Sequence, residues 1–206
     1  MPTIGLFPLA MVLLPGERTA LHIFEPRYKE LIGKCLEEEG DFGIVLIDLN
    51  GTRKVGTRAS VVEVIERFDD GRLNIIVEGN DRFRIHQIND ELSYLTAEID
   101  EFADEVPLPG HEEYELCLDD YRRVVAAAAL ELEEPSPDYR GLAFHIAAQI
   151  ELSPDAKQGI LEMRSETARL SLVRQLLDAA AKALRLRTVE RRASTNGQVD
   201  WPGLAR

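Results

Sequence analysis

The sequence has few cysteines, no long apolar run and no recognisable export signal. Only two of its 206 residues are cysteine, and no apolar run approaches the ~18 residues that a membrane-spanning helix needs. The N-terminal residues lack a basic segment followed by an apolar core and a small-residue cleavage site, so they do not resemble a signal peptide. We therefore expect a cytoplasmic protein that does not enter membranes. Cys35 and Cys117 lie on the apolar faces of predicted helices, so we expect them to be buried free thiols.

Positive charge is also scarce. The chain has 24 Lys and Arg residues against 37 Asp and Glu residues, which gives a formal net charge of −13. Residues 1–105 alone contain 11 basic and 21 acidic residues. Nucleic-acid affinity depends mainly on basic side chains that neutralise phosphates. Nucleic acid is therefore not an expected partner of this chain.

Motifs for metal binding and catalysis are missing. The four histidines, His22, His86, His111 and His145, are scattered, and none has a Cys or His partner at the spacing of a metal site. We expect His22 to satisfy a buried backbone group rather than to transfer protons. The sequence predicts no metal, no cofactor, no catalytic residue and no enzymatic activity. The alternative is a hydrolase whose site assembles only in space, around His22 or His145.

A phosphate-binding loop is absent as well. The nearest string is GTRKVGTR at residues 51–58, in which Thr57 stands where the motif needs lysine and Arg58 where it needs a magnesium-binding hydroxyl. This string is better interpreted as a turn that enters a strand.

The most informative stretch is FPLAMVLLPGERTALHIFEPRY at residues 7–28. Its two apolar runs, Phe7–Leu14 and Leu21–Phe24, predict strands that are joined by a turn at Pro15-Gly16. Pro26 suits the first turn of a helix, because the first helical N–H groups have no intrahelical partner. We predict a helix over Pro26–Glu39 that ends at Gly40.

Residues 42–102 have the pattern of a strand-rich region. Phe42–Asp48 is a continuous apolar run, which predicts a strand buried on both faces. The following segments alternate between apolar and polar residues and are separated by turn signals. We predict strands at Ala59–Phe68, Leu73–Glu78, Phe83–His86 and Tyr94–Phe102, with turns at 50–51, 69–72 and 79–80. Such a pattern favours an antiparallel meander that curls into a barrel or a sandwich.

Helical spacing begins after the turn signals of Pro107–Gly110. We predict four helices: one through Tyr114–Ala128, one opened by Ser136-Pro137, one opened by Ser153-Pro154, and a long final helix capped by Ser165. Each has one apolar stripe, which is typical of a helical bundle. The predicted organisation is a β-rich subdomain at 1–106, a helical subdomain at 107–190 and a mobile tail at 191–206, which includes Trp201.

Two small groups of polar residues need a functional and a structural interpretation. Glu25 and Arg27 flank Pro26, and we favour a structural role, in which Glu25 caps the helix and Arg27 pairs with a barrel carboxylate, over a charged binding rim. Glu66, Asp69 and Asp70 match no calcium-loop spacing and are expected to form a solvated turn.

Two further features lie near turns and ends. The sequon Asn50-Gly51-Thr52 is interpreted as a turn. A basic cluster near the end of the last predicted helix is expected to stabilise that helix end, with the docking of an acidic partner or nucleic acid as the alternative. The cluster consists of Lys182, Arg185, Arg187, Arg191 and Arg192.

Several strings, in order, resemble one known family. FPL, LLPG and HIFEPRY at the N-terminus resemble the start of the Lon protease N-terminal domain, also called the LON substrate-binding domain. VGTRASVVEV, DGRLNIIVEG, RFRI and YLTAEI look like its later strands, and KQGILEM is similar to its helical end. The resemblance covers about residues 3–180.

This resemblance implies a fold and a role. The implied fold is α+β, with a PUA-like β pseudo-barrel followed by a four-helix bundle region. The implied role is non-catalytic binding of unfolded or damaged polypeptide, without the ATPase and protease domains of Lon, so we expect a stand-alone substrate-recognition domain. The contact residues and the oligomeric state are unknown at this stage. The alternatives are a PUA-like module that binds RNA or a small molecule, and a regulatory partner of a separate protease.

Overall fold

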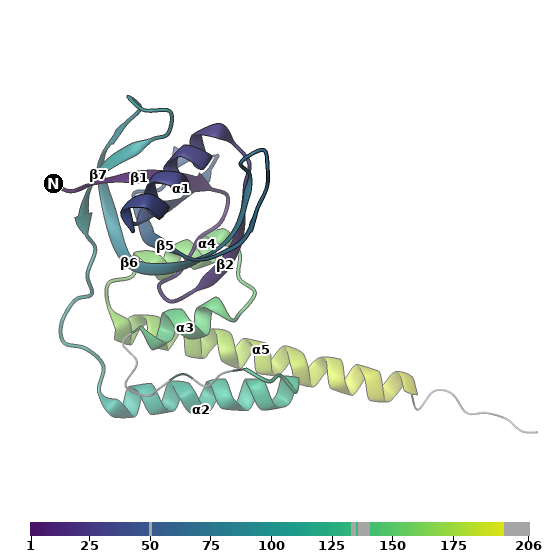
Figure 1. Cartoon of the computed structure of the whole chain (residues 1–206). Helices are drawn as coiled ribbons and strands as arrows, with labels where there is room; N and C mark the ends of the chain where they lie inside the picture. Colours follow the sequence, from purple (N-terminus) through teal and green to yellow (C-terminus); the bar gives the residue numbers. More distant parts are fainter. Residues whose placement is uncertain (50, 133–134, 136–140, 196–206) are drawn as a thin grey trace, which may run out of the picture.

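The computed structural model describes residues 1–49, 51–132, 135 and 141–195. A barrel-like sheet lies on one side of the molecule and a layer of helices on the other (Figure 1), which confirms the predicted α+β class. The strands are β1 (Thr3–Leu9), β2 (Arg18–Ile23), β3 (Phe42–Asp48), β4 (Gly51–Thr52), β5 (Val55–Arg67), β6 (Leu73–Asn89) and β7 (Thr96–Glu101). The helices are α1 (Pro26–Glu38), α2 (His111–Ala128), α3 (Leu142–Ala148), α4 (Pro154–Glu162) and α5 (Glu166–Thr195).

Five strands form a closed ring of pairings. The order is β1-β7-β6-β5-β3, and a parallel pairing between β1 and β3 closes the ring. Parallel strands need a crossover between them, and β2 with α1 provides it. The predicted antiparallel meander is therefore correct for β5, β6 and β7 but misses this parallel pair. β2 pairs with β6, and β4 extends β3, outside the ring.

The first strand differs from its prediction. β1 ends at Leu9, whereas the apolar run predicted a strand through Leu14. Val12, Leu13 and Leu14 are buried but lie outside any strand. The hydroxyl of Thr57 donates to the Leu13 carbonyl over 2.6 Å. This carbonyl therefore bonds to a side chain and not to the backbone of a neighbouring strand. The apolar run at residues 12–14 therefore reflects burial and not strand structure.

The predicted turn at Gly79-Asn80 is wrong, because β6 runs through both residues. Gly79 donates its N–H to the Glu17 carbonyl over 2.9 Å, and its own carbonyl accepts from the N–H of Gly16 over 2.7 Å. A Cβ atom at position 79 would overlap the carbonyl oxygen of Leu14. The glycine thus allows a close approach of two backbone segments rather than a change of direction.

Helix α1 packs its apolar face against the inside of the barrel, and Figure 1 shows it framed by the strands. Its buried residues are Tyr28, Leu31, Ile32 and Cys35. Pro26 occupies the first turn as predicted. The left-handed residue at the helix end is Glu39, with φ of 51°, and not the predicted Gly40, whose N–H instead donates to the Cys35 carbonyl.

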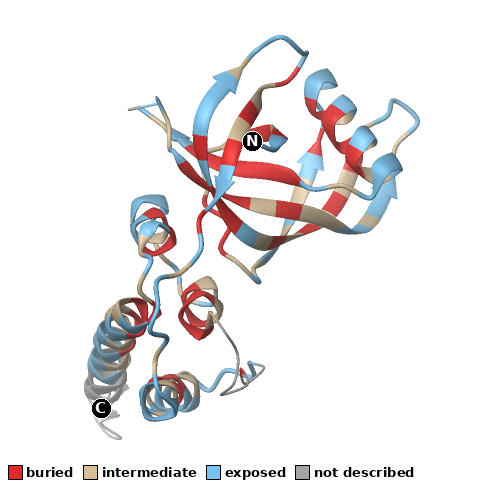
Figure 2. Ribbon diagram, turned by 90° about the vertical axis from the view of Figure 1, so that its left-hand side faces the viewer, coloured by how far each residue is buried: buried red, intermediate tan, exposed pale blue. Residues whose placement is uncertain are grey.

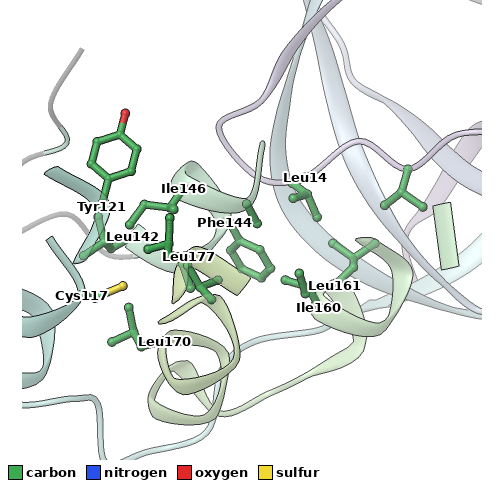
Figure 3. Packing of buried hydrophobic residues seen from close by; sticks show 14 of the residues in the cluster. Leu14, Cys117, Tyr121, Leu142, Phe144, Ile146, Ile160, Leu161, Leu170 and Leu177 are labelled. Carbon is green, nitrogen blue, oxygen red and sulfur yellow. The ribbon is translucent and has the colours of Figure 1, made fainter. Parts of the chain in front are cut away.

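In the helical layer, α2 and α3 pack against α5, while α4 contacts both α3 and strand β5. One apolar core continues from these helices into the barrel. Figure 3 shows Leu14 of the barrel close to Phe144, Ile160 and Leu161 of the helices. None of the described helices is both long and apolar enough to cross a membrane.

The helix boundaries test several capping predictions. Ser153 accepts a hydrogen bond from the Ala156 N–H, and Ser165 accepts one from the Ala168 N–H, so both predicted caps are confirmed. Helix α3 begins at Leu142, after Gly141 with φ of 87°, and the predicted cap Ser136-Pro137 lies outside the described residues. Helix α5 continues through residues 191–195, the first part of the predicted tail. Residues 196–206, with Trp201, are not described.

Candidate functional site

Strand β2 leaves one edge of the sheet open. Among the described strands it pairs only with β6, in antiparallel register, with Ala20 opposite Ile76 and His22 opposite Asn74. The hydrogen bond from the Gly79 N–H to the Glu17 carbonyl determines which residues of β2 form hydrogen-bonded pairs with β6 and which do not. Because hydrogen-bonded and non-hydrogen-bonded pairs alternate, the N–H and C=O groups of Ala20 and His22 point away from β6. The outer edge of β2 therefore presents free backbone groups.

Large apolar side chains are exposed at the end of β2 and on β5, the strand that flanks β6 on its other side. Phe24, which directly follows β2, is 58% exposed, and Val62 and Ile65 on β5 are 44% and 55% exposed. Val62 and Ile65 lie at register shifts in the β5–β6 pairing, between Val61 and Glu63 and between Val64 and Glu66. Such bulges change the direction in which side chains point. We call Phe24, Val62 and Ile65 the apolar rim.

A row of polar and aromatic groups crosses the same three strands. His22 is exposed, its Nδ1 atom lies 2.6 Å from Oδ1 of Asn74, and the Asn74 amide donates to Glu66 over 3.0 Å. The ring centroids of Phe24 and Phe68 lie 5.8 and 6.1 Å from that of His22. The predicted burial of His22 against a backbone group is therefore wrong. This histidine belongs to an exposed surface row.

The junction between barrel and helices contains a network of four charged residues, of which three are buried and Asp104 is partly exposed. Arg169 of α5 is fully buried, and Arg82 of β6 is 6% exposed. Both guanidinium groups bind the carboxylate of Asp104, and Arg169 also binds Glu166 over 2.8 Å. Arg82 donates further to the Leu161 and Met163 carbonyls, over 2.7 Å each. Two positive and two negative groups thus balance each other in the interior.

The network also shifts the acidity of its arginines. Burial lowers the pKa of Arg82 to about 10, partly offset by the charge of Asp104. Burial also acts to lower the pKa of Arg169, but the hydrogen bond to Asp104 and the charge of Glu166 outweigh it and raise this pKa. Both arginines are therefore charged at neutral pH. A group without access to water and already paired serves structure rather than chemistry.

Aromatic rings line the network. The Arg82 guanidinium lies 5.0 Å from the ring of Phe102 and 5.2 Å from that of Phe144, and Arg169 lies 4.2 Å from Phe144. No sequence pattern pointed to Arg82, Asp104, Glu166 or Arg169. The only local signal is the i,i+3 spacing of Glu166 and Arg169, which occurs on many exposed helices.

A cleft of about 410 Å³ opens beside this network, where the barrel meets the helices. Its walls come from β6, the segment between β7 and α2, and the start of α3. Figure 2 shows that this connecting segment is mostly exposed. The apolar lining residues are Pro15, Phe102, Ala103, Val106, Leu108, Tyr114 and Phe144, and the polar ones are Asn80, Asp81, Arg82, Glu101, Asp104 and Glu166, with Gly141 between them. We call this feature the junction cleft.

The two charged residues that flank Pro26 pair with each other. Glu25 occupies the N-cap position of α1 but makes no side-chain cap, which corrects the prediction. Arg27 pairs with Glu25 over 2.8 Å, not with a barrel carboxylate, and lies 4.5 Å from the ring of Tyr28. These two residues hold each other on the surface.

The acidic hairpin is an ordered turn. Asp70 accepts from the Arg72 N–H over 3.1 Å and from its side chain over 2.7 Å, which lowers the pKa of Asp70. Glu66 instead accepts a hydrogen bond from Asn74 and belongs to the exposed row that contains His22. Within the described residues there is no group of three or more His, Cys, Asp or Glu side chains that could hold a metal ion. Asn50 of the sequon lies outside the described residues.

The other histidines have separate surroundings. His86 pairs with Asp100, His111 lies 3.9 Å from Glu115, and His145 lies 2.8 Å from the Gln149 amide. Within the described residues, the hydrogen-bond partner of His22 is Asn74 and not a serine, cysteine or carboxylate. The hydrolase alternative thus gains no support from the contacts of His22.

The two cysteines are buried as expected. Burial raises the pKa of both Cys35 and Cys117 to about 11, so neither is a reactive thiolate at neutral pH. In the basic cluster, Lys182 pairs with Asp178 over 2.6 Å and lowers the pKa of that carboxylate. The side chains of Arg187, Arg191 and Arg192 are not described.

Solved structures share this architecture. The structure described as the Lon N-terminal domain protein from Xanthomonas campestris superposes with a TM-score of 0.65, at 25% identity, over 86% of this chain and 98% of that one. The N-terminal domain of the Mycobacterium avium complex Lon protease superposes with a TM-score of 0.66, at 18% identity, over the same shares.

Curated relatives are similar over one part of their length. Lon protease 2 of Myxococcus xanthus is 29% identical over 141 residues, which are 64% of this chain but 17% of that protein. Lon protease 1 of Hydrogenovibrio crunogenus is 24% identical over 84% of this chain and 24% of its own length. The chain thus spans about a quarter or less of these relatives.

The match to a family covers nearly the whole chain. Residues 3–179 match the family described as the ATP-dependent protease La (LON) substrate-binding domain. The matched range includes the barrel, the helical layer, the open edge of β2 and the junction cleft. The chain therefore belongs to the LON substrate-binding domain family, a family of substrate-recognition modules.

Proposed function

We propose that this protein binds unfolded or damaged polypeptide without chemically changing it, through the open edge of β2 and the apolar rim. The observation that carries the proposal is the combination of a regular strand, paired along one edge only among the described strands, with Phe24 at its end, 58% exposed. Membership of a substrate-binding family also supports a role in binding.

The edge and the rim supply two kinds of interaction. An extended peptide can add to an open strand through main-chain hydrogen bonds, which do not depend on its sequence. Apolar side chains of the peptide then gain free energy by leaving water against Phe24, Val62 and Ile65. Folded proteins pair most of their backbone groups and bury most of their apolar segments, so this surface favours unfolded chains.

The two edges beside β6 are not equivalent. β5 from Ser60 to Arg67 pairs with β6 but not with β3, whose register ends at Ala59. Its bulges at Val62 and Ile65 interrupt the regular ladder that an added strand needs. We therefore assign strand addition to β2, and assign to β5 the provision of apolar contacts.

The test is a fluorescence-anisotropy titration of the protein into a labelled, permanently unfolded polypeptide. Saturable binding in the range of ~10–100 μM is expected, equivalent to about −6 kcal/mol, with no binding to a folded protein that carries the same label. The rim variant Phe24→Ser/Ile65→Ser should weaken this binding. Leu92→Ser is the matched control, because Leu92 is 52% exposed on the distant β6–β7 connection.

Three outcomes would contradict the proposal. One is the absence of binding at high micromolar concentration, which would direct attention to a protein partner. Another is equal loss of affinity in the Leu92 control and in the rim variant. The third is tighter, salt-sensitive binding to a single-stranded RNA probe, which would favour the PUA-like RNA-binding alternative.

A further inference from the structure

The junction cleft combines apolar walls with unpaired acid groups. Val106 and Leu108, on the connecting segment, are 85% and 41% exposed. They face a cleft that is also lined by the rings of Phe102 and Phe144. Exposed aliphatic groups beside buried aromatic rings are typical of a site that binds an apolar side chain.

The connecting segment is held in place at its base. The N–H of Glu105 donates to the Arg164 carbonyl over 2.8 Å, and the Arg164 side chain donates to the Ala103 carbonyl over 3.0 Å. The Arg164 guanidinium also lies 5.6 Å from the ring of Phe102. The wall that carries Val106 is thus anchored to the α4–α5 turn, which gives the cleft a fixed side.

The charges of the cleft are unbalanced. Arg82 pairs with Asp104, whose side chain is 25% exposed, and Arg169 pairs with the buried Glu166. Asp81 and Glu101, both exposed and both lining the cleft, pair with no basic side chain among the described residues. The cleft is therefore lined by two carboxylates that have no ion-pair partner among the described residues, next to apolar groups. The nearby cations Arg84 and Arg164 lie 4.5 and 5.6 Å from the ring of Phe102.

We infer that the junction cleft is a second contact site for substrate polypeptide, and that it selects segments in which a lysine or arginine stands next to an aromatic or aliphatic residue. The apolar side chain would pack against Val106, Leu108 and Phe102, and the cation would lie between Asp81 and Glu101. The inference rests on the proposed polypeptide binding and names its preferred substrate class. Two weak sites on one chain also bind one long substrate more tightly than either site alone.

The test uses three labelled peptides of equal length that differ at one position. Each has a Leu-X-Phe centre in a Gly/Ser background, with X as Lys, Gln or Glu. We expect the affinity to fall in the order Lys, Gln, Glu. The difference between Lys and Gln should shrink at high salt, because exposed charge pairs are screened.

Matched variants distinguish the effect of the cleft carboxylates from that of the overall negative charge of the protein. Asp81→Asn/Glu101→Gln should weaken binding of the Lys peptide about three- to tenfold, as expected for two exposed charge contacts, and leave the Gln peptide unchanged. Asp90→Asn/Glu91→Gln removes the same charge at the exposed β6–β7 connection and should leave both unchanged. A Val106→Ser/Leu108→Ser variant should weaken the Lys and Gln peptides alike.

A photo-crosslinkable aromatic residue in place of the peptide Phe locates the contact. Attachment to residues 80–82 or 102–108 is expected. Equal affinity for the three peptides, or attachment to β2 and β5 alone, would overturn the cleft assignment while leaving the proposed polypeptide binding intact. Failure of every peptide and of the unfolded polypeptide to bind would overturn both.

Discussion

Gly79 on β6 lies directly against the carbonyl group of Leu14, so closely that a Cβ atom at position 79 would overlap the Leu14 oxygen. The segment that contains Leu14 connects β1 to β2 and carries buried residues of both the barrel core and the helical core. Gly79 therefore fixes the position of a segment that both halves of the molecule share.

The first prediction concerns this contact. Gly79→Ala should destabilise the protein by about 1–3 kcal/mol, because the added methyl group meets a backbone oxygen that cannot move without shifting the chain. The measurement is the free energy of unfolding in urea. Gly159→Ala is the control, since nothing lies within 4 Å of a Cβ there on helix α4, and it should stabilise by up to about 1 kcal/mol. A loss of stability in the control equal to that of Gly79→Ala would refute the explanation.

The second prediction concerns the buried charge network. Arg169→Met should cost about 3–5 kcal/mol, because it leaves Glu166, whose side chain is 1% exposed, without its cation. Glu166 also accepts from the Ala143 N–H of α3 over 3.2 Å, so the start of α3 should loosen as well. Urea unfolding gives the energy, and hydrogen exchange of the α3 amides gives the location.

Arg18→Met is the comparison for that variant. Arg18 pairs with Glu78 over 2.5 Å, but its side chain is 67% exposed, and exposed pairs contribute little. Its loss should change stability by less than about 1 kcal/mol. Equal costs for the two arginines would mean that the network contributes no more than a surface pair.

The sequence predicted those features whose cause is local. Residues 42–46 are buried on both faces of β3 because none of them is polar, whereas Ile47 is 43% exposed and Asp48 is half-buried at the end of the strand. Pro26, Ser153 and Ser165 mark helix starts because their effect depends on the nearest backbone groups only. The open edge of β2 and the junction cleft depend on residues that are distant in sequence, and no local pattern contained them.

The features that the sequence did not predict also depend on residues that are far apart in the chain. The parallel pairing of β1 with β3 depends on where a crossover returns the chain. Gly79 has the same local pattern as a turn glycine, and only its contact with Leu14 gives it a different role. Arg82 and Asp104 are ordinary charged residues of a strand and a connection until α5 brings Arg169 to them.

The third prediction is a pH dependence. Burial raises the pKa of Cys35 and of Cys117 from 9.0 to about 11 in the folded protein. The folded state therefore binds more protons than the unfolded state between these values, and stability contributed by the thiols is complete below pH 9 and is lost as the pH rises to about 11. Urea unfolding at pH 8 and pH 10 should show this loss. The Cys35→Ala/Cys117→Ala variant should lose less stability over the same interval, and an identical pH dependence would contradict the prediction.

The last prediction tests strand addition at β2. Ala20→Pro removes an N–H that points away from β6, and proline is tolerated at the edge of a sheet on that side. The variant should keep its fold, as measured by circular dichroism and urea unfolding, yet bind unfolded polypeptide more weakly, because an added strand loses one main-chain hydrogen bond, worth about 0.5–1.5 kcal/mol. Ala20→Val keeps the N–H while adding bulk at the same position, so it should bind normally. Equal weakening by both variants would indicate side-chain contact rather than strand addition, and unchanged binding by Ala20→Pro would move the contact to the apolar rim alone.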